Sequence, residues 1–118
     1  MPLKILYAED QRSIREIFET LLKRRGHEVV MAENGHVLLE TLKVGKFDLV
    51  LTDNDMPEMT GIQALRAIRA DPRFESLPVV VFSAGQVKEA VEKAGGIYMD
   101  KWGSREDLYA VIDKLMSA

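Results

Sequence analysis

The feature of this sequence that most constrains its fold is a regular alternation of short apolar runs with longer segments of helical periodicity. The apolar runs cover residues 3–8, 29–31, 47–52, 79–82 and 97–99. Each run has the length of a strand, and the segment after it repeats apolar residues three and four positions apart, as an amphipathic helix does. Alternating strands and helices form parallel sheets with right-handed crossovers. The sequence therefore predicts one doubly wound α/β domain with a five-stranded parallel sheet over residues 1–118.

The expected helices have start and stop signals of their own. They cover residues 13–25, 37–44, a segment around 62–68, 86–94 and a segment around 108–115. The first ends in three basic residues followed by Gly26, which suits a helix C-terminus. Asn34-Gly35 predicts a turn before the second helix. Ser104 with Asp107 three residues later resembles a capping box at the start of the last helix.

Composition and charge restrict the classes of function. Sixteen basic and nineteen acidic residues give a net charge of -3, which supplies no general attraction to nucleic acid or anionic lipid. The chain has no cysteine, so it forms no disulfide and no thiolate site. Its apolar runs are far shorter than a membrane span. We therefore expect a cytoplasmic protein that contacts neither nucleic acid nor membrane directly, with His27 and His36 in packing or surface roles.

Polar residues gather where the predicted strands end. Glu9 and Asp10 end the first strand, Asp53 the third and Ser83 the fourth, and Lys101 follows the fifth. Ligands of open α/β sheets bind outside the carboxyl ends of the strands. We therefore expect these five residues, scattered along the chain, to converge at one rim of the sheet.

This set of residues predicts a metal-assisted phosphoryl acceptor. Three clustered carboxylates repel one another, and a hard divalent cation with oxygen ligands relieves that cost. Mg²⁺ is the expected cofactor, with Mn²⁺ as the alternative. With metal bound, a carboxylate oxygen of Asp53 can attack a phosphoryl group whose charge is neutralised by the metal and by the Lys101 ammonium. The product would be an acyl phosphate on Asp53.

The segment around Asp53 also carries a family resemblance. From Asp48 to Gly61 it reads Asp-Leu-Val-Leu-Thr-Asp-Asn-Asp-Met-Pro-Glu-Met-Thr-Gly, which resembles the phosphoacceptor segment of response-regulator receiver domains of the CheY-like family. The resemblance covers essentially the whole chain. It implies a flavodoxin-like (β/α)5 fold with strand order 2-1-3-4-5 and a stand-alone receiver.

The resemblance further implies a role for each polar residue at the rim. Asp53 is the phosphorylation site, Ser83 the hydroxyl that bonds the new phosphoryl oxygen, Tyr98 the switch aromatic and Lys101 the phosphate-contacting lysine. The implied metal ligands are Asp10, Asp53 and the backbone carbonyl of Asp55, with Glu9 acting through water.

The implied function is that of a two-component receiver rather than an enzyme. The phosphoryl donor is a histidine kinase or a histidine phosphotransfer protein, and phosphorylation changes the face formed by the fourth helix, fifth strand and fifth helix. We expect no output domain after the last helix, and therefore signalling through a downstream protein or onward phosphate transfer. A chemotaxis-type effector, a phosphorelay intermediate and a domain of a larger regulator all fit.

Two other functions use the same residues. Asp53-Asn-Asp also resembles the nucleophile motif of haloacid-dehalogenase-type phosphatases, but those place it on the first strand and this chain has no room for a substrate cap. A receiver-like binding module that works without phosphorylation is the other alternative. Phosphoryl uptake in the presence of metal discriminates against the binding module, and turnover of a small phosphate ester would favour the phosphatase.

The chain departs from the family pattern beside Lys101. The family lysine precedes a cis proline, whereas Lys101 precedes Trp102, where a cis bond would cost about 2.5 to 4 kcal/mol. We therefore predict a trans bond. Seventeen residues separate Ser83 from Lys101, roughly one helical turn fewer than in the family, which predicts a short or displaced fourth helix. We expect an altered output surface, with Trp102 as an anchor for a partner.

Overall fold

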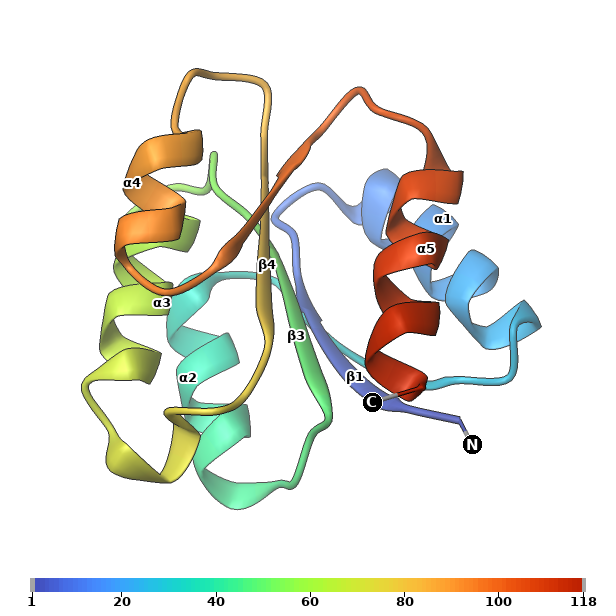
Figure 1. The fold of residues 1–118 in the computed structure, drawn as a ribbon, viewed down its shortest axis with the longest axis horizontal. Coiled ribbons are helices and arrows are strands. Elements are labelled where there is room, and N and C mark those ends of the chain that lie inside the picture. Colours follow the sequence, from blue (N-terminus) through green and yellow to red (C-terminus); the bar gives the residue numbers. More distant parts are fainter. Residues whose placement is uncertain (1, 118) are drawn as a thin grey trace.

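Five short strands form one parallel sheet in the order β2-β1-β3-β4-β5 (Figure 1). The strands are β1 (Lys4–Ala8), β2 (Glu28–Ala32), β3 (Leu49–Asp53), β4 (Val79–Ser83) and β5 (Ile97–Asp100). The computed structural model describes residues 2–117, so the predicted domain limits at residues 1 and 118 lie outside the described residues. Both the parallel sheet and its strand order agree with the prediction.

Helices cover both faces of this sheet. They are α1 (Arg12–Arg24), α2 (Gly35–Val44), α3 (Gly61–Arg69), α4 (Lys88–Lys93) and α5 (Arg105–Met116), with a 3-10 turn, η1, at Pro72–Phe74. Helices α2, α3 and α4 lie on one face, and α1 and α5 lie on the other (Figure 1). None of the helices between residues 2 and 117 is long and apolar enough to cross a membrane.

Alternating residues of the strands supply two apolar cores, one under each helical layer. In β1, Leu6 and Ala8 pack under α2 and α3, whereas Ile5 and Tyr7 pack under α1 and α5. Strands β3 and β4 are buried at every position, which is why their sequences are almost wholly apolar. The exceptions are Thr52 and the polar residues at the strand ends, so burial holds the site on a rigid support.

Most predicted element boundaries differ from the structure by one to three residues, and two of these differences involve a hydrogen bond from a side chain. The Asn34 side chain accepts a hydrogen bond from the backbone N–H of Val37 at 2.9 Å, so Asn34 caps α2 and the helix starts at Gly35. The third strand begins at Leu49 rather than at residue 47 because the Asp48 side chain accepts a hydrogen bond from the Lys4 backbone. Helix α4 has only six residues, as the short spacing predicted.

The loop between β3 and α3 is held close against the end of β3. A Cβ on Gly61 would lie 2.6 Å from the Asp53 carbonyl oxygen, so only glycine permits this approach. Thr60 and Gln63 form a capping box at the start of α3, which the sequence reading missed. At α5, the Ser104 hydroxyl accepts a hydrogen bond from the Asp107 backbone, as expected.

Candidate functional site

Three carboxylates meet where β1 and β3 end. Glu9 and Asp10 directly follow β1, and Asp53 is the last residue of the neighbouring β3. One carboxylate oxygen from each residue lies within 4.8 Å of the other two. Glu9 and Asp53 are each only 1% exposed, and Asp10 is half-buried. The structure thus brings together the acidic residues that the sequence placed at one rim.

Lys101 brings a positive charge to the same cluster. Its Nζ lies 3.1 Å from Asp53 Oδ2, and its side chain is 14% exposed. The backbone N–H of Lys101 donates to the Ser83 carbonyl at 3.1 Å, which fixes the residue after β5 against the end of β4. The position of the Lys101 backbone therefore holds the ammonium in contact with Asp53.

Burial and the neighbouring charges shift the pKa values of Glu9, Asp53 and Lys101. Burial, with the charge of Asp53 as a further cause, raises the pKa of Glu9 to about 7. Burial also raises the pKa of Asp53, although the hydrogen bond and charge of Lys101 oppose this. Burial lowers the pKa of Lys101, but the hydrogen bond and charge of Asp53, with smaller contributions from Glu9 and Asp55, outweigh it and raise the pKa. Burial therefore favours the neutral forms of Glu9 and Asp53, and Lys101 opposes this only in part.

The three carboxylates fit a hard divalent cation. Asp10 Oδ1 and Asp53 Oδ1 are buried, and neither has a hydrogen-bond partner among the described residues. Buried polar atoms without partners are rare and call for an ion or a water. The donors are all carboxylate oxygens, the ligands that Mg²⁺ takes in proteins. Glu9, Asp10 and Asp53 could therefore hold a magnesium or manganese ion.

Ser83 and Tyr98 are linked to each other through the loop after β4. The buried Ser83 hydroxyl accepts a hydrogen bond from the backbone N–H of Gly85 at 3.0 Å. The half-buried Tyr98 hydroxyl contacts the carbonyls of Ser83 at 3.2 Å and Gly85 at 3.3 Å. One short loop therefore connects the end of β4 with the aromatic residue of β5.

Trp102 is exposed beside the site. Its side chain is 76% exposed, and its ring centroid lies 5.8 Å from Lys101 Nζ. The Lys101-Trp102 bond is trans, as predicted, because no described peptide bond is cis. Asp55 is also exposed, next to Asp53. Anchoring of a partner by Trp102 stays a prediction.

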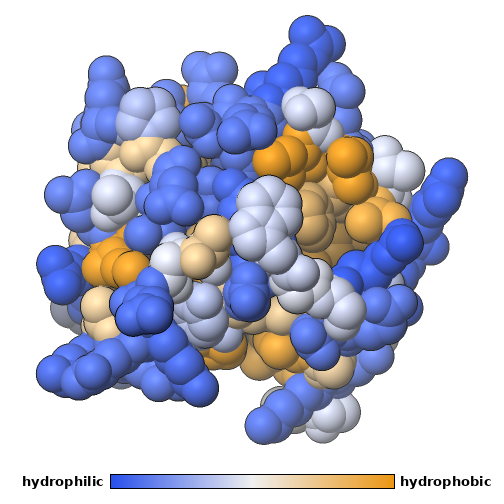
Figure 2. Space-filling model, turned by 90° about the horizontal axis from the view of Figure 1, so that it is seen from above, coloured by the Kyte–Doolittle hydropathy of each residue, from blue (hydrophilic) through white to orange (hydrophobic). Residues whose placement is uncertain are grey.

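A hollow of about 210 Å³ opens onto the carboxylates from the side of α1. Figure 2 looks onto the carboxyl ends of the strands and shows apolar side chains beside a hollow on the right, where α1 and α5 lie in Figure 1. The hollow is lined by Tyr7, Glu9, Ile14, Ile17, Phe18, Asp53, Phe82, Lys101 and Trp102. Asp53 and Lys101 can thus be approached from outside the molecule.

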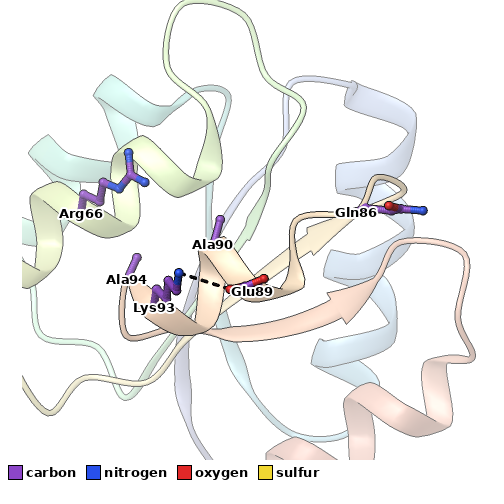
Figure 3. A pocket seen from close by; sticks show the side chains of 6 residues that line it. All are labelled: Arg66, Gln86, Glu89, Ala90, Lys93 and Ala94. Carbon is purple, nitrogen blue, oxygen red and sulfur yellow. Dashed lines mark ion pairs between the residues drawn. The ribbon is translucent and has the colours of Figure 1, made fainter.

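Another hollow, of about 480 Å³, lies between α3 and α4 and contains none of the predicted site residues. Figure 3 shows Arg66 on α3 facing the short α4, where Lys93 and Glu89 form an ion pair at 3.2 Å. The side chains that line it are charged, polar or small and mostly exposed. We therefore assign the chemistry to the carboxylate cluster.

Two residues that support the site were missed in the sequence. Asn54 is buried, and its Oδ1 accepts a hydrogen bond from the Ile62 backbone at 3.0 Å, which ties the loop after Asp53 to α3. Arg15 donates to the backbone of the acidic pair. The role of Asn54 could have been predicted, since Asn side chains commonly form hydrogen bonds to nearby backbone groups. The role of Arg15 could not have been predicted, because an arginine on an amphipathic helix is usually a solvated charge.

Neither histidine belongs to the carboxylate cluster among the described residues. His36 is exposed at the start of α2. His27 is 6% exposed, and its Nδ1 accepts a hydrogen bond from the Leu3 backbone at 3.0 Å. This contact gives His27 a packing role.

Comparisons with known proteins place the chain in a family. The response regulator receiver domain family matches residues 5–113. Chemotaxis protein CheY of Pseudomonas aeruginosa is 36% identical, with 96% of this chain and 95% of the relative covered. The structure is similar to chemotaxis response regulator CheY4 of Vibrio cholerae (TM-score 0.88, 25% identity, 98% of this chain and 99% of that chain). It is also similar to response regulator TrrA of Thermotoga maritima in complex with Mg²⁺-BeF (TM-score 0.86, 27% identity, 98% and 99%). This chain therefore belongs to the response-regulator receiver domains, the receivers of two-component systems.

Proposed function

We propose that Asp53 accepts a phosphoryl group and that Asp10, Asp53 and the backbone carbonyl of Asp55 hold the Mg²⁺ or Mn²⁺ that this transfer requires, with Glu9 acting through water. The observation that carries the proposal is the pairing of Lys101 with Asp53 at 3.1 Å inside a cluster of three carboxylates. The acceptor oxygen of Asp53, the Lys101 ammonium and carboxylate oxygens that can bind a metal are thus close together. The complex of TrrA with Mg²⁺-BeF supports the same assignment.

The chemistry follows from the charges at the site. A carboxylate oxygen of Asp53 forms a bond to phosphorus, the bond from phosphorus to the donor's nitrogen or oxygen breaks, and the leaving group keeps the electron pair. The Lys101 ammonium compensates the charge of the transferring phosphoryl oxygens. A bound divalent cation supplies the rest of the charge compensation. The backbone carbonyl of Asp55 completes the proposed ligand set, and Glu9 acts through water.

We propose that the loop from Ser83 to Gly85 transmits the change. The Ser83 hydroxyl leaves Gly85 to bond the new phosphoryl oxygen, which alters the two carbonyls that the Tyr98 hydroxyl contacts. The face of α4, β5 and α5 then changes its preferred arrangement. This proposal makes the domain a phosphoacceptor rather than an enzyme, located in the cytoplasm with its kinase or phosphotransfer donor and its downstream protein partner.

Intact-mass measurement tests the phosphoacceptor. Wild-type protein is incubated with acetyl phosphate, with and without Mg²⁺, beside Asp53→Asn. We expect an adduct of one phosphoryl group that needs the metal and is absent from Asp53→Asn. Glu40→Gln is the matched control, because it also removes one carboxylate charge but lies exposed on α2, outside the carboxylate cluster.

Two results would contradict the proposal. A wild-type protein that takes up no phosphoryl group in Mg²⁺ would favour a binding module that works without phosphorylation. An adduct that persists in Asp53→Asn would place the acceptor elsewhere.

A further inference from the structure

Arg15 of α1 forms hydrogen bonds to the backbone of Glu9 and Asp10. Its Nη1 donates to the backbone carbonyls of Glu9 at 2.8 Å and Asp10 at 3.1 Å. Side chains of a helix lean toward its N-terminus, which lets Arg15 reach the loop that precedes α1. Of the side chains that the structure describes, only Arg15 donates to these two carbonyls.

This loop has few other anchors. Gln11, the residue before α1, makes no side-chain capping bond to the helix. The Glu9 backbone N–H donates to Ala32 at 3.0 Å, and the Gln11 N–H donates to the Glu9 carboxylate at 3.1 Å. The Glu9 and Asp10 carbonyls belong to the two peptide planes that flank the Asp10 Cα. Arg15 therefore fixes the backbone on both sides of Asp10.

The charge of Arg15 and its hydrogen bonds should have opposite effects on metal affinity. The positive charge of Arg15 alone disfavours a cation at the neighbouring carboxylates. A fixed backbone, by contrast, aims the Asp10 and Glu9 carboxylates at one point, and groups that orient metal ligands in this way raise metal affinity. The sign of the effect of removing Arg15 therefore distinguishes the two roles.

We propose that Arg15 is a positioning residue for the divalent-metal site: by holding the Glu9 and Asp10 carbonyls it sets the direction of both carboxylates. This inference rests on the proposed function, because it concerns the same metal site. It assigns Arg15 a task that its place on an amphipathic helix does not suggest.

Calorimetric titration with MgCl₂ tests the proposal. Arg15→Met keeps the apolar stem and removes the guanidinium, and we expect its Mg²⁺ affinity to fall about 10- to 100-fold, the effect typical of groups that orient ligands. Arg12→Met is the matched control, since Arg12 is on the same helix, is exposed and, among residues 2–117, forms its side-chain ion pair with Glu16 alone, at 2.9 Å. Its Mg²⁺ affinity should equal or slightly exceed that of wild type.

Arg15→Lys provides a second variant if Arg15→Met folds poorly. An ammonium repels Mg²⁺ as a guanidinium does, so any affinity that Arg15→Lys regains over Arg15→Met comes from restored hydrogen bonds. We expect an affinity between those of Arg15→Met and wild type. Wild-type affinity in Arg15→Met, or an equal loss in Arg12→Met, would overturn the proposal for Arg15 alone, whereas a wild type that binds no Mg²⁺ would overturn the metal site itself and this proposal with it.

Amide hydrogen exchange in metal-free protein gives a readout that does not depend on the metal. The Gln11 N–H donates to the Glu9 carboxylate, so a loosened loop exposes it. We expect faster exchange at Gln11 in Arg15→Met than in Arg12→Met, with equal melting temperatures. Equal exchange in the two variants would contradict the positioning role.

Discussion

His27 makes the stability of the domain depend on pH through one hydrogen bond. Its Nδ1 accepts from the Leu3 backbone, so protonation of this nitrogen breaks the bond. Burial, and then the charge of Arg25, lower the pKa of His27 from its usual value of 6.5. The unfolded chain therefore binds this proton more readily, and the stabilisation is present above about pH 6.5 and lost as the pH falls toward the lowered pKa.

Chemical denaturation of His27→Asn across this range measures the effect. The Asn carbonyl can replace Nδ1 as acceptor but does not titrate. We expect the free energy of unfolding of wild type to fall relative to His27→Asn between about pH 7 and pH 5.5. His36→Asn, at an exposed position, should follow wild type. If wild type and His27→Asn change in parallel, the hydrogen bond is not the cause.

The sequence predicted the reactive residues better than the residues that support them. Asp53 and Lys101 could be placed at one rim because each ends or follows a strand, and the carboxyl ends of parallel strands share an edge. Arg15 could not be predicted, because its role depends on the direction of its side chain and on which carbonyls the loop leaves open. The pKa of about 7 for Glu9 likewise depends on burial that only the packed structure defines.

The loop between β3 and α3 contains a strained residue. Glu58 has φ of 68°, in the left-handed region that costs a residue with a Cβ roughly 1 to 2 kcal/mol. Glu58→Gly should therefore raise the free energy of unfolding by about 0.5 to 1 kcal/mol, the greater freedom of glycine in the unfolded chain offsetting the rest. Glu58→Ala keeps the Cβ and should give no such gain.

Gly26, which follows α1, allows the opposite substitution as a control. It has φ of 90° after α1, and a Cβ there would meet no atom within 4 Å. Gly26→Ala should thus lose about 1 kcal/mol through backbone strain alone. Urea denaturation of the three variants measures these values. Equal stability of Glu58→Gly and Glu58→Ala would show that the left-handed backbone carries no cost here.

At this scale the alternation of strands and helices was predictable and the capping details were not. Every strand is identified by its apolar run, since a parallel sheet buries both faces of its central strands. Boundaries differed from the prediction by one to three residues, and at two of them a side chain bonds to the backbone, as Asn34 does at α2 and Asp48 before β3. The short α4 could be predicted from the number of residues between Ser83 and Lys101. The ends of β4 and β5 are fixed by the sheet, so fewer residues between them leave a shorter helix.

When no metal is bound, the buried Glu9 carboxyl group makes the stability of the whole domain fall as the pH rises through about 7. Burial raises the pKa of Glu9 from 4.5 to about 7, so the folded state holds this proton more tightly than the unfolded chain. The stability it contributes is therefore present below about pH 4.5 and is lost as the pH rises through 7. A protein that binds Mg²⁺ only when folded regains stability by mass action.

Glu9→Gln tests this balance between folding and metal binding. In metal-free protein at pH 8 we expect its free energy of unfolding to exceed that of wild type by roughly 3 kcal/mol, because the amide avoids the cost of a buried charge. The difference should disappear near pH 4.5 and reverse in saturating Mg²⁺, which stabilises wild type more. Glu33→Gln, at an exposed position, removes the same charge and should match wild type throughout. Equal metal-free stability of wild type and Glu9→Gln at pH 8 would show that the clustered carboxylates impose no folding cost, and the case for a cation that relieves it would fail.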